Sequence, residues 1–322
     1  MARILAREMQ CMVLPVDAVD GQYGRANLEL LKNTLSLYSL SRVHGAQVHV
    51  IVQRGASLVT RVLLLRLWRK ITHGALIFDF DDPIFLESPF TTIAICKLAD
   101  AVTVSNEALA RYARQYNQRV FILPTSIDLE LYQSGEKKDS RIPTIGWIGT
   151  PSNLEFLRIL NDPLRRLHES NHFVFRILTD SRFKDRVPLD SSLPVEVEEW
   201  TYPGFVGRLR TFDIGVCPLL DTVWTQGKSG YKVLEYMALQ IPPIASAIGE
   251  NCKIVKDGVN GYLVSTPDEW LGRMQSLLND SELRARIGQA GRKTVEESYT
   301  IEKTARLLAD VIISLDQNGS TE

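Results

Sequence analysis

A stretch in the second half of the chain combines two lysines, a glutamate and small residues at a spacing suited to diphosphate binding. Gly227, Lys228 and Ser229 open an apolar helical pattern, and Lys232 follows within it. Residues four apart share one helix face, so both ammonium groups would project near the positive helix N-terminus and bind a diphosphate. Glu235 lies three residues further along that face and could accept both hydroxyls of a ribose. A solvated lysine–glutamate face is the alternative, but the apolar strand directly after the helix favours a packed site.

Two further loops could offer backbone groups to the same ligand. Gly149 and Thr150 follow an apolar strand and precede a helical pattern, where backbone N–H groups can bind a phosphate. A glycine required only by turn geometry explains that loop equally well. Gly249, Glu250 and Asn251 follow another apolar strand and would present their N–H groups beside the lysine-containing segment. We therefore count all five among the candidate binding residues.

Three acids in the first half form a second candidate site. Asp79, Asp81 and Asp82 lie at the carboxyl end of an apolar strand. They could orient a hydroxyl group, or one of them could act as a general base. An aspartate-rich turn before Pro83, with capping roles only, is the alternative. We favour function slightly, because three adjacent acids repel one another unless something uses them.

Short apolar runs alternate with amphipathic stretches, which is typical of βαβ units with parallel strands. In the first half, strands are expected at 11–16, 48–52, 75–80, 101–104 and 120–123, and helices at 27–41, 57–73, 91–99 and 106–115. In the second half, strands are expected at 144–148, 173–178, 195–200, 214–218, 243–246 and 262–264, and helices at 153–169, 229–240, 267–278, 281–298 and 301–315.

A polar stretch at 124–140 is interpreted as a linker between two α/β domains. We expect an N-terminal Rossmann-like domain with this linker at 1–140, a C-terminal ligand-binding domain at 141–300, and a final helix at 301–322 that returns to the first domain. Two doubly wound domains would face each other across a cleft at the carboxyl ends of their strands, where ligands bind.

Composition excludes several other classes of protein. The 322 residues carry a formal net charge of -1, which gives no reason to expect a nucleic-acid partner. The 4 cysteines lie far apart, without metal-ligand or redox spacing, and the 5 histidines are scattered, so no metal site is expected. No apolar run is long enough to span a bilayer, and the first ten residues lack a signal-peptide pattern. We therefore expect a cytoplasmic protein.

The beginning of the chain predicts two unusual features. Residues 2–10 have the pattern of a helix end and 11–16 that of a second strand, so the first domain is expected to lack its central first strand. The alternative is that residues 1–10 form that strand. Between Glu29 and Asp79 every charged residue is basic, and the helix at 57–73 mixes basic and apolar residues. Peripheral contact with an anionic inner membrane face is one hypothesis, and a core-packed helix with a basic outer face is the other.

The chain, from about residue 1 to residue 299, resembles the retaining GT-B glycosyltransferases of group 1, the family 4-like branch. The second half carries the more specific matches: Trp147-Ile148-Gly149-Thr150-Pro151, residues 213–219, 227–238 and 242–246, Gly249, and the turn at 257–261. The first half adds Gln53-Arg54, residues 78–83, 99–102, and 124–128.

This resemblance implies transfer of a sugar from a nucleoside diphosphate to a hydroxyl of a glycan or lipid-linked acceptor, with retention and with no metal or other cofactor. Glu235 would be the second glutamate of the family's Glu-x7-Glu pattern, which grips the donor ribose. The first glutamate is replaced by Gly227, and the usual basic residue after the strand at 144–148 is absent. Lys228 and Lys232 would then carry more of the diphosphate charge.

Relatives of this fold hold the nucleotide base near the position of Trp200 and Thr201, although a packed aromatic explains that tryptophan about as well. Two alternatives to a transferase remain. One is a different enzyme on the same fold, an epimerase or a phosphorylase, of which the latter would need a pyridoxal lysine. The other is a protein that binds nucleotide sugars without transferring them, which the missing first glutamate favours mildly.

Overall fold

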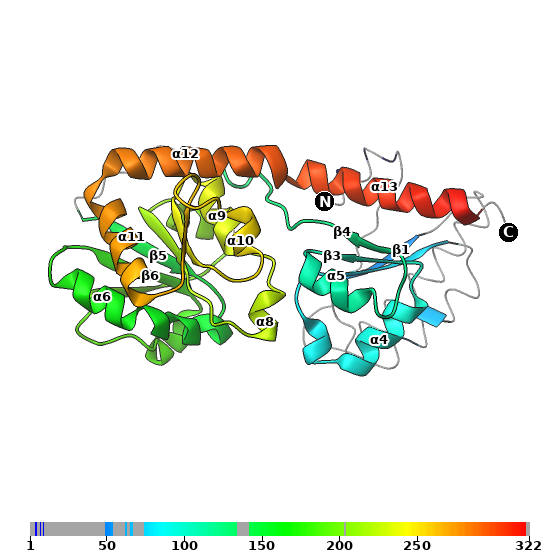
Figure 1. The fold of residues 1–322 in the computed structure, drawn as a ribbon, viewed down its shortest axis with the longest axis horizontal. Helices are drawn as coiled ribbons and strands as arrows, with labels where there is room; N and C mark the ends of the chain where they lie inside the picture. The colour runs from blue at the N-terminus through cyan, green and yellow to red at the C-terminus, as the bar shows by residue number, and fades with distance from the viewer. Residues whose placement is uncertain are drawn as a thin grey trace. The chain divides into compact units, whose positions relative to one another are not determined.

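The computed structural model describes residues 49–53, 74–133, 142–202 and 204–319, together with Ile4, Arg7, Met9, Val62, Leu65 and Arg66. The chain divides into two compact units (Figure 1). Unit 1 comprises Met1–Pro124 and Glu302–Glu322, and unit 2 comprises Thr125–Ile301. Each contains a parallel sheet with helices, so the predicted α/β class with two Rossmann-like domains is confirmed.

In the described part of unit 1, four short strands pair in chain order. They are β1 (Val50–Gln53), β2 (Leu76–Phe80), β3 (Ala101–Val104) and β4 (Val120–Ile122), all parallel. The middle strands β2 and β3 are almost continuously buried, as expected for parallel strands covered on both faces. The carboxyl ends of β1, β2 and β3 therefore meet at one edge of this sheet.

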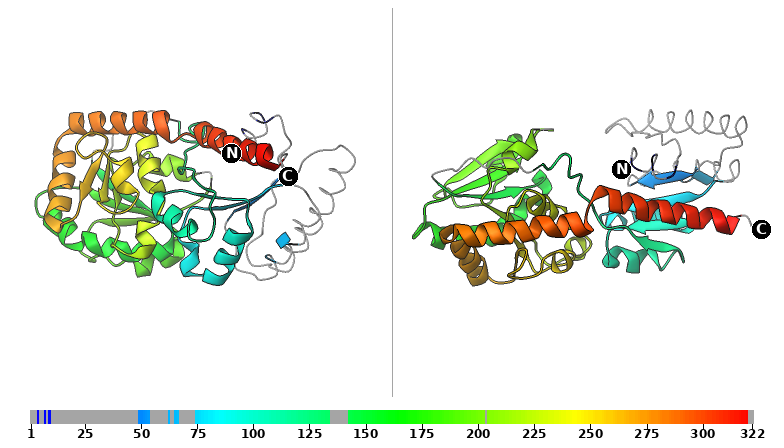
Figure 2. Two further views of the ribbon diagram at one scale, coloured as in Figure 1. Left: turned by 45° about the vertical axis from the view of Figure 1, so that its right-hand side comes forward. Right: turned by 90° about the horizontal axis from the view of Figure 1, so that it is seen from above.

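Helices cover both faces of the unit 1 sheet. Side chains alternate along β2, so Phe78 and Phe80 pack in one core with α4 (Pro89–Leu98) and α5 (Glu107–Ala113). Ile77 packs in the other core with α13 (Ile301–Gly319), which lies along the sheet (Figure 2). The short η1 (Ile84–Leu86) follows β2. The C-terminal helix is thus a structural part of unit 1 from Glu302 onward.

Several predictions for the first unit lie outside the described residues. These are the strand at 11–16, the helix at 27–41, and the question whether a central first strand is present. Ile4 and Arg7 are helical, as the pattern at 2–10 indicates. Within the predicted helix at 57–73, Val62 and Leu65 are buried in the core and Arg66 is exposed, which favours a core-packed helix with a basic outer face.

Unit 2 has a six-stranded parallel sheet in the order β10-β9-β8-β5-β6-β7. The strands are β5 (Thr144–Ile148), β6 (Val174–Thr179), β7 (Val195–Glu199), β8 (Ile214–Cys217), β9 (Pro243–Ser246) and β10 (Tyr262–Val264), close to the predicted ranges. The order reverses between β5 and β8, which are neighbours in the sheet but far apart in the chain. Ligands of doubly wound sheets bind at the carboxyl ends of strands beside such a switch point.

The helices of unit 2 cover both faces of this sheet, where two apolar cores form. They are η2 (Pro151–Leu160), α6 (Asn161–His168), η3 (Ser181–Arg186), α7 (Phe205–Leu209), α8 (Val223–Gln226), α9 (Tyr231–Ala238), α10 (Asn251–Ile254), α11 (Pro267–Asn279) and α12 (Ser281–Ser298). The predicted helix at 153–169 is a 3₁₀ stretch that continues into a shorter α-helix. The four-residue α8 and α10 have no clear periodic signal, yet they flank the candidate site.

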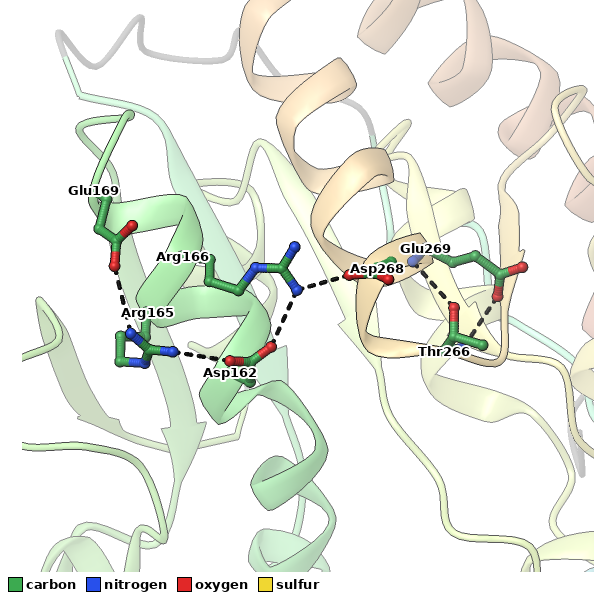
Figure 3. A network of polar contacts seen from close by, with 7 residues as sticks. All are labelled: Asp162, Arg165, Arg166, Glu169, Thr266, Asp268 and Glu269. Carbon is green, nitrogen blue, oxygen red and sulfur yellow. Dashed lines mark hydrogen bonds and ion pairs between the residues drawn. The ribbon is translucent and has the colours of Figure 1, made fainter.

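A polar network on the surface joins α6 to α11 (Figure 3). Arg166 Nη1 lies 3.2 Å from Asp162 Oδ2 and 2.7 Å from Asp268 Oδ1, so one guanidinium bridges the two helices. Thr266 and Glu269 form a capping box at the start of α11. These side chains are largely exposed, so their ion pairs contribute little to the stability of the fold.

The segment after Pro124 belongs to unit 2, so the boundary falls earlier than the predicted one at 140. Ile127 pairs with Thr300 in a short parallel bridge. Tyr132 is 1% exposed and lies within the core formed with α9. Part of the expected linker is thus packed structure, because it contributes a large buried side chain and backbone hydrogen bonds.

Candidate functional site

The lysine-containing segment approaches α9 through a left-handed turn. Gly230 has φ 70° and stands directly before the first helical residue, Tyr231. L side chains rarely adopt this φ, and a Cβ atom here would lie 2.4 Å from Ile254 Cδ1, so a substitution would strain the turn. The helix therefore starts two residues later than predicted. Lys228 and Ser229 lie in the loop before it, and Lys228 does not share a helix face with Lys232.

The two lysines nevertheless converge on one place. Lys232 Nζ lies 4.9 Å from the centroid of the Trp147 ring, and Lys228 Nζ lies 5.4 Å from that of Trp224. Both ammonium charges act on the thiol of Cys217, at the end of β8. Burial raises the pKa of that thiol, and Lys232 and Lys228 act to lower it. Tertiary structure thus brings Lys228 and Lys232 near the same thiol, although the two lysines do not share a helix face.

Gly149 borders the same place from β5. A Cβ atom here would lie 2.5 Å from the Trp147 ring and 3.0 Å from Lys232 Nζ. The missing side chain therefore leaves the backbone of this loop open to the ammonium group. Thr150 is exposed, and its Oγ1 accepts a hydrogen bond from Asn153 Nδ2 at 2.7 Å, which stabilises the start of η2.

The loop after β9 packs directly against the segment that leads to Lys228. Gly249 has φ 56°, and its added Cβ would lie within 3.1 Å of the carbonyl oxygens of Thr225 and Gln226. Asn251 is buried and donates to the Ser246 carbonyl at 3.1 Å. Glu250 pairs with Lys253 at 3.3 Å, and burial raises the pKa of its carboxyl.

Glu235 lies on α9 with only 4% of its surface exposed. Its Oε1 accepts a hydrogen bond from Tyr132 Oη at 2.7 Å. Burial raises the pKa of Glu235 to about 7, while the Tyr132 hydrogen bond and the Lys232 charge act in the opposite direction. Sequence reasoning missed Tyr132 and Trp224, and it noted Trp147 only as a family match without a contact to Lys232, because no local pattern links these rings to the lysines or the glutamate.

Trp200 and Thr201 follow β7, two strands away from β5 along the same edge of the sheet. Adjacent strands lie about 4.8 Å apart, so these residues stand roughly 10 Å along the sheet from Gly149. Trp200 is 44% exposed, and its ring centroid lies 5.5 Å from that of Phe205. Tyr202 flanks the same phenylalanine at 6.2 Å. The two partly exposed rings suit stacking against a planar group.

The acidic residues of unit 1 have different local roles. Asp79 Oδ1 accepts from Thr103 Oγ1 at 2.6 Å, and its Oδ2 accepts from Gln53 Nε2 at 3.1 Å. This carboxylate therefore joins the ends of three strands. The carbonyl of Asp81 accepts from Ser105 Oγ, and that of Asp82 from the Ile84 amide, so both begin the turn into η1. A role toward an acceptor stays a prediction for all three.

Within the described residues, no group of three or more His, Cys, Asp or Glu side chains is arranged to hold a metal ion. In that same part of the chain, no helix combines the length and the apolar character needed to cross a bilayer.

Residues 209–294 match the family model described as glycosyl transferases group 1. The chain is 32% identical over 117 residues to spore coat protein SA of Bacillus subtilis, covering 35% of this chain and 30% of that protein. It is 37% identical over 81 residues to the putative glycosyltransferase EpsD of the same organism, covering 24% of this chain and 21% of that protein. The chain thus spans a third or less of the length of these curated relatives.

Two solved structures are similar in fold to this chain over nearly its whole length. A glycosyltransferase from Rickettsia africae has a TM-score of 0.69 at 12% identity, covering 97% of this chain and 87% of that one. HepE from Anabaena, in complex with UDP and glucose, has a TM-score of 0.69 at 14% identity, covering 97% and 89%. The protein therefore has the GT-B fold of glycosyltransferases. The segment at 209–294, which contains the lysines and Glu235, is similar to the group 1 glycosyl transferases.

Proposed function

We propose that this chain transfers a sugar from a nucleoside-diphosphate sugar to a hydroxyl group of a glycan or lipid-linked acceptor, with retention of configuration. One observation carries the proposal. Lys228 and Lys232 converge at the start of α9, beside Gly149 and the end of β8, at the switch point of a doubly wound sheet. Two cations and a helix N-terminus at such a point suit a diphosphate.

The aromatic rings beside the lysines explain how the site stays organised. Lys232 Nζ lies over the Trp147 ring and Lys228 Nζ over the Trp224 ring, and these cation–π contacts help to hold the two ammonium groups in place. As the bond to the sugar breaks, negative charge grows on the diphosphate. Lys228, Lys232 and the first N–H groups of α9 would stabilise that charge, with no cofactor required.

The remaining donor contacts follow from position. Glu235 lies one helical turn beyond Lys232, and we assign it to the ribose hydroxyls. Trp200 and Thr201 are assigned to the nucleotide base, because Trp200 and Tyr202 offer partly exposed rings at the same sheet edge. Thr150, Ser229, Gly249, Glu250 and Asn251 complete the proposed donor site.

The acceptor hydroxyl must be oriented and must lose its proton. Asp81 and Asp82 of unit 1 are the groups we propose for this task. Asp79 already bonds to Thr103 and Gln53, so its main effect would be to align the neighbouring strand ends. Contact of unit 1 with anionic lipid stays a prediction, which co-sedimentation with anionic vesicles at low salt would test.

A second candidate function is nucleotide-sugar binding without transfer. Gly227 occupies the position of the first glutamate of the family pattern, and it is buried as the C-cap of α8. That position therefore supplies no side chain to the donor sugar. A binding protein and a transferase would share the lysines and Glu235, so only product formation separates them.

Calorimetry with UDP, GDP and ADP on the full chain tests the donor site. Lys232→Met and Lys228→Met should each weaken binding at least tenfold, because a charge-assisted contact contributes roughly 1.5–3 kcal/mol. Lys293→Met is the matched control, since this lysine is exposed on α12. Equal affinities for all variants would refute the assigned site. Release of nucleoside diphosphate from a sugar donor, with the anomer of the product read by NMR, then separates transfer from binding.

A further inference from the structure

A chain of hydroxyl groups runs from the start of α9 to the buried carboxylate of Glu235. Tyr132 Oη donates to Glu235 Oε1 at 2.7 Å and lies 3.3 Å from Tyr231 Oη. A phenol carries one proton, and that of Tyr132 is used on the carboxylate. Tyr231 must therefore be the donor toward Tyr132. Tyr231 is 41% exposed, so the chain connects the surface with the interior.

Tyr132 is held rigidly in this position. Arg292 Nη1, from α12, donates to the Tyr132 carbonyl at 2.8 Å and to the Ala238 carbonyl at 2.6 Å. The ring of Phe205 packs edge-on against the Tyr132 ring, with centroids 6.0 Å apart. The tyrosine is thus fixed to α9 through its hydroxyl at Glu235 and through its backbone at the C-terminal end of the helix.

We propose that Tyr132, supported by Tyr231, is a positioning residue that holds the Glu235 carboxylate in the ionised and oriented form needed to accept hydroxyl groups of a ribose. The proposal rests on the donor site assigned above and extends it to a residue that no motif marks. It also gives a reason for the hydrogen bond that Tyr132 donates to the buried Glu235 carboxylate.

The surroundings of Glu235 show why this one proton matters. Burial opposes ionisation of Glu235, whereas the Tyr132 hydrogen bond and the Lys232 charge favour it. The other titratable groups that interact with Glu235 are Tyr231 and Tyr236 on α9 and Cys217 on β8. Burial raises the pKa of each, so they are neutral near pH 7. Ionisation thus depends on one lysine and the hydroxyl chain.

The test compares pH profiles of Tyr132→Phe and the wild type. Phenylalanine keeps the ring and removes only the donor. The pH at which Glu235 ionises, measured from unfolding free energies against the same proteins carrying Glu235→Gln, should rise by roughly one unit. Affinity at pH 7 for whichever of UDP, GDP and ADP the wild type binds should fall about fivefold, and the difference should narrow above about pH 8.

Two further variants complete the design. Tyr231→Phe should shift the profile in the same direction by a smaller amount, because it only weakens the donor strength of Tyr132. Tyr262→Phe, a buried tyrosine on β10, is the control and should leave the profile unchanged. If Tyr132→Phe lowers the unfolding free energy equally at every pH, and the pH at which Glu235 ionises does not shift, Tyr132 has a structural role alone and the proposal is overturned.

Failure of the donor assignment gives a different result. If the wild type binds none of the three nucleotides at any pH, the proposed function falls, and the unfolding profile alone decides whether Tyr132 controls ionisation of Glu235. If the wild type binds and Tyr132→Phe keeps both its affinity and its midpoint, the donor site stands and the positioning role is refuted.

Discussion

Replacing Glu235 with glutamine should make the protein more stable at high pH and leave it nearly unchanged at low pH. The side chain is 4% exposed, and burial raises its pKa from the ordinary value of 4.5 to about 7. Folding therefore binds a proton that the unfolded chain releases between these two values. Stability from this group is fully present below pH 4.5 and is lost as pH rises to about 7.

The size of the effect follows from the two pKa values. Each pH unit between them is worth about 1.4 kcal/mol, so ionised Glu235 costs the folded state about 3 kcal/mol above pH 7. Glutamine has nearly the same shape and never ionises. The difference in unfolding free energy between Glu235→Gln and the wild type should therefore grow by about 3 kcal/mol from about pH 4.5 to about pH 8.

Urea denaturation followed by tryptophan fluorescence is a suitable assay, because Trp147, Trp200, Trp224 and Trp270 all lie in unit 2. Glu297→Gln, an exposed carboxylate on α12, is the matched control and should show no comparable trend. Parallel stability curves for Glu235→Gln and the wild type across this pH range would refute the burial of an ionisable carboxylate. The same variant should bind nucleotide more weakly, so stability and binding should change in opposite directions above pH 7.

Four further substitutions test the packing of unit 2 and a helix cap in unit 1. Gly230→Ala should destabilise unit 2 by about 2 kcal/mol or more and weaken nucleotide binding, because it combines φ 70° with a contact of 2.4 Å to Ile254; unchanged urea midpoints would contradict this. Gly288→Ala places a Cβ 2.0 Å from the Gln240 carbonyl and should destabilise unit 2, because α12 lies close to the chain after α9 at this point. Gly272→Ala on α11 meets nothing within 4 Å and should stabilise unit 2 by about 0.5–1 kcal/mol. Equal effects of the two substitutions on the urea midpoint would refute the close approach at Gly288. Asn106→Ala removes the side chain that accepts from the Leu109 amide at 3.0 Å, and calorimetric melting should show a loss of about 1 kcal/mol in unit 1.

The local hydrophobic pattern of the sequence was sufficient to predict the strands and the fold class. Ten strands agree with their predicted ranges to within two residues, because nine are short, mainly apolar runs bounded by turn residues and β7 alternates valine with glutamate. The segment 227–238 could be selected as the candidate functional one, since its lysines, glycines and glutamate all lie within residues 227–235. The fold class followed from the same alternation of strands and helices.

The geometry of the site could not be predicted in this way. Periodicity placed both lysines on one helix face, but the left-handed Gly230 delays the start of α9 and leaves Lys228 in a loop. Lys232 lies over Trp147 and Lys228 over Trp224, rings from two other elements, and both charges act on the Cys217 thiol. No property of residues 228–232 alone contains that information.

The sequence by itself determined the strands and helices, the class of fold and the segment that carries Lys228, Lys232 and Glu235. Those depend on interactions between residues a few positions apart, which a linear pattern records. Only the tertiary structure decided that Glu235 is buried and bonded to Tyr132, 103 residues away in the chain. Burial and long-range hydrogen bonds set the protonation of a carboxylate, and both arise only when distant segments pack together.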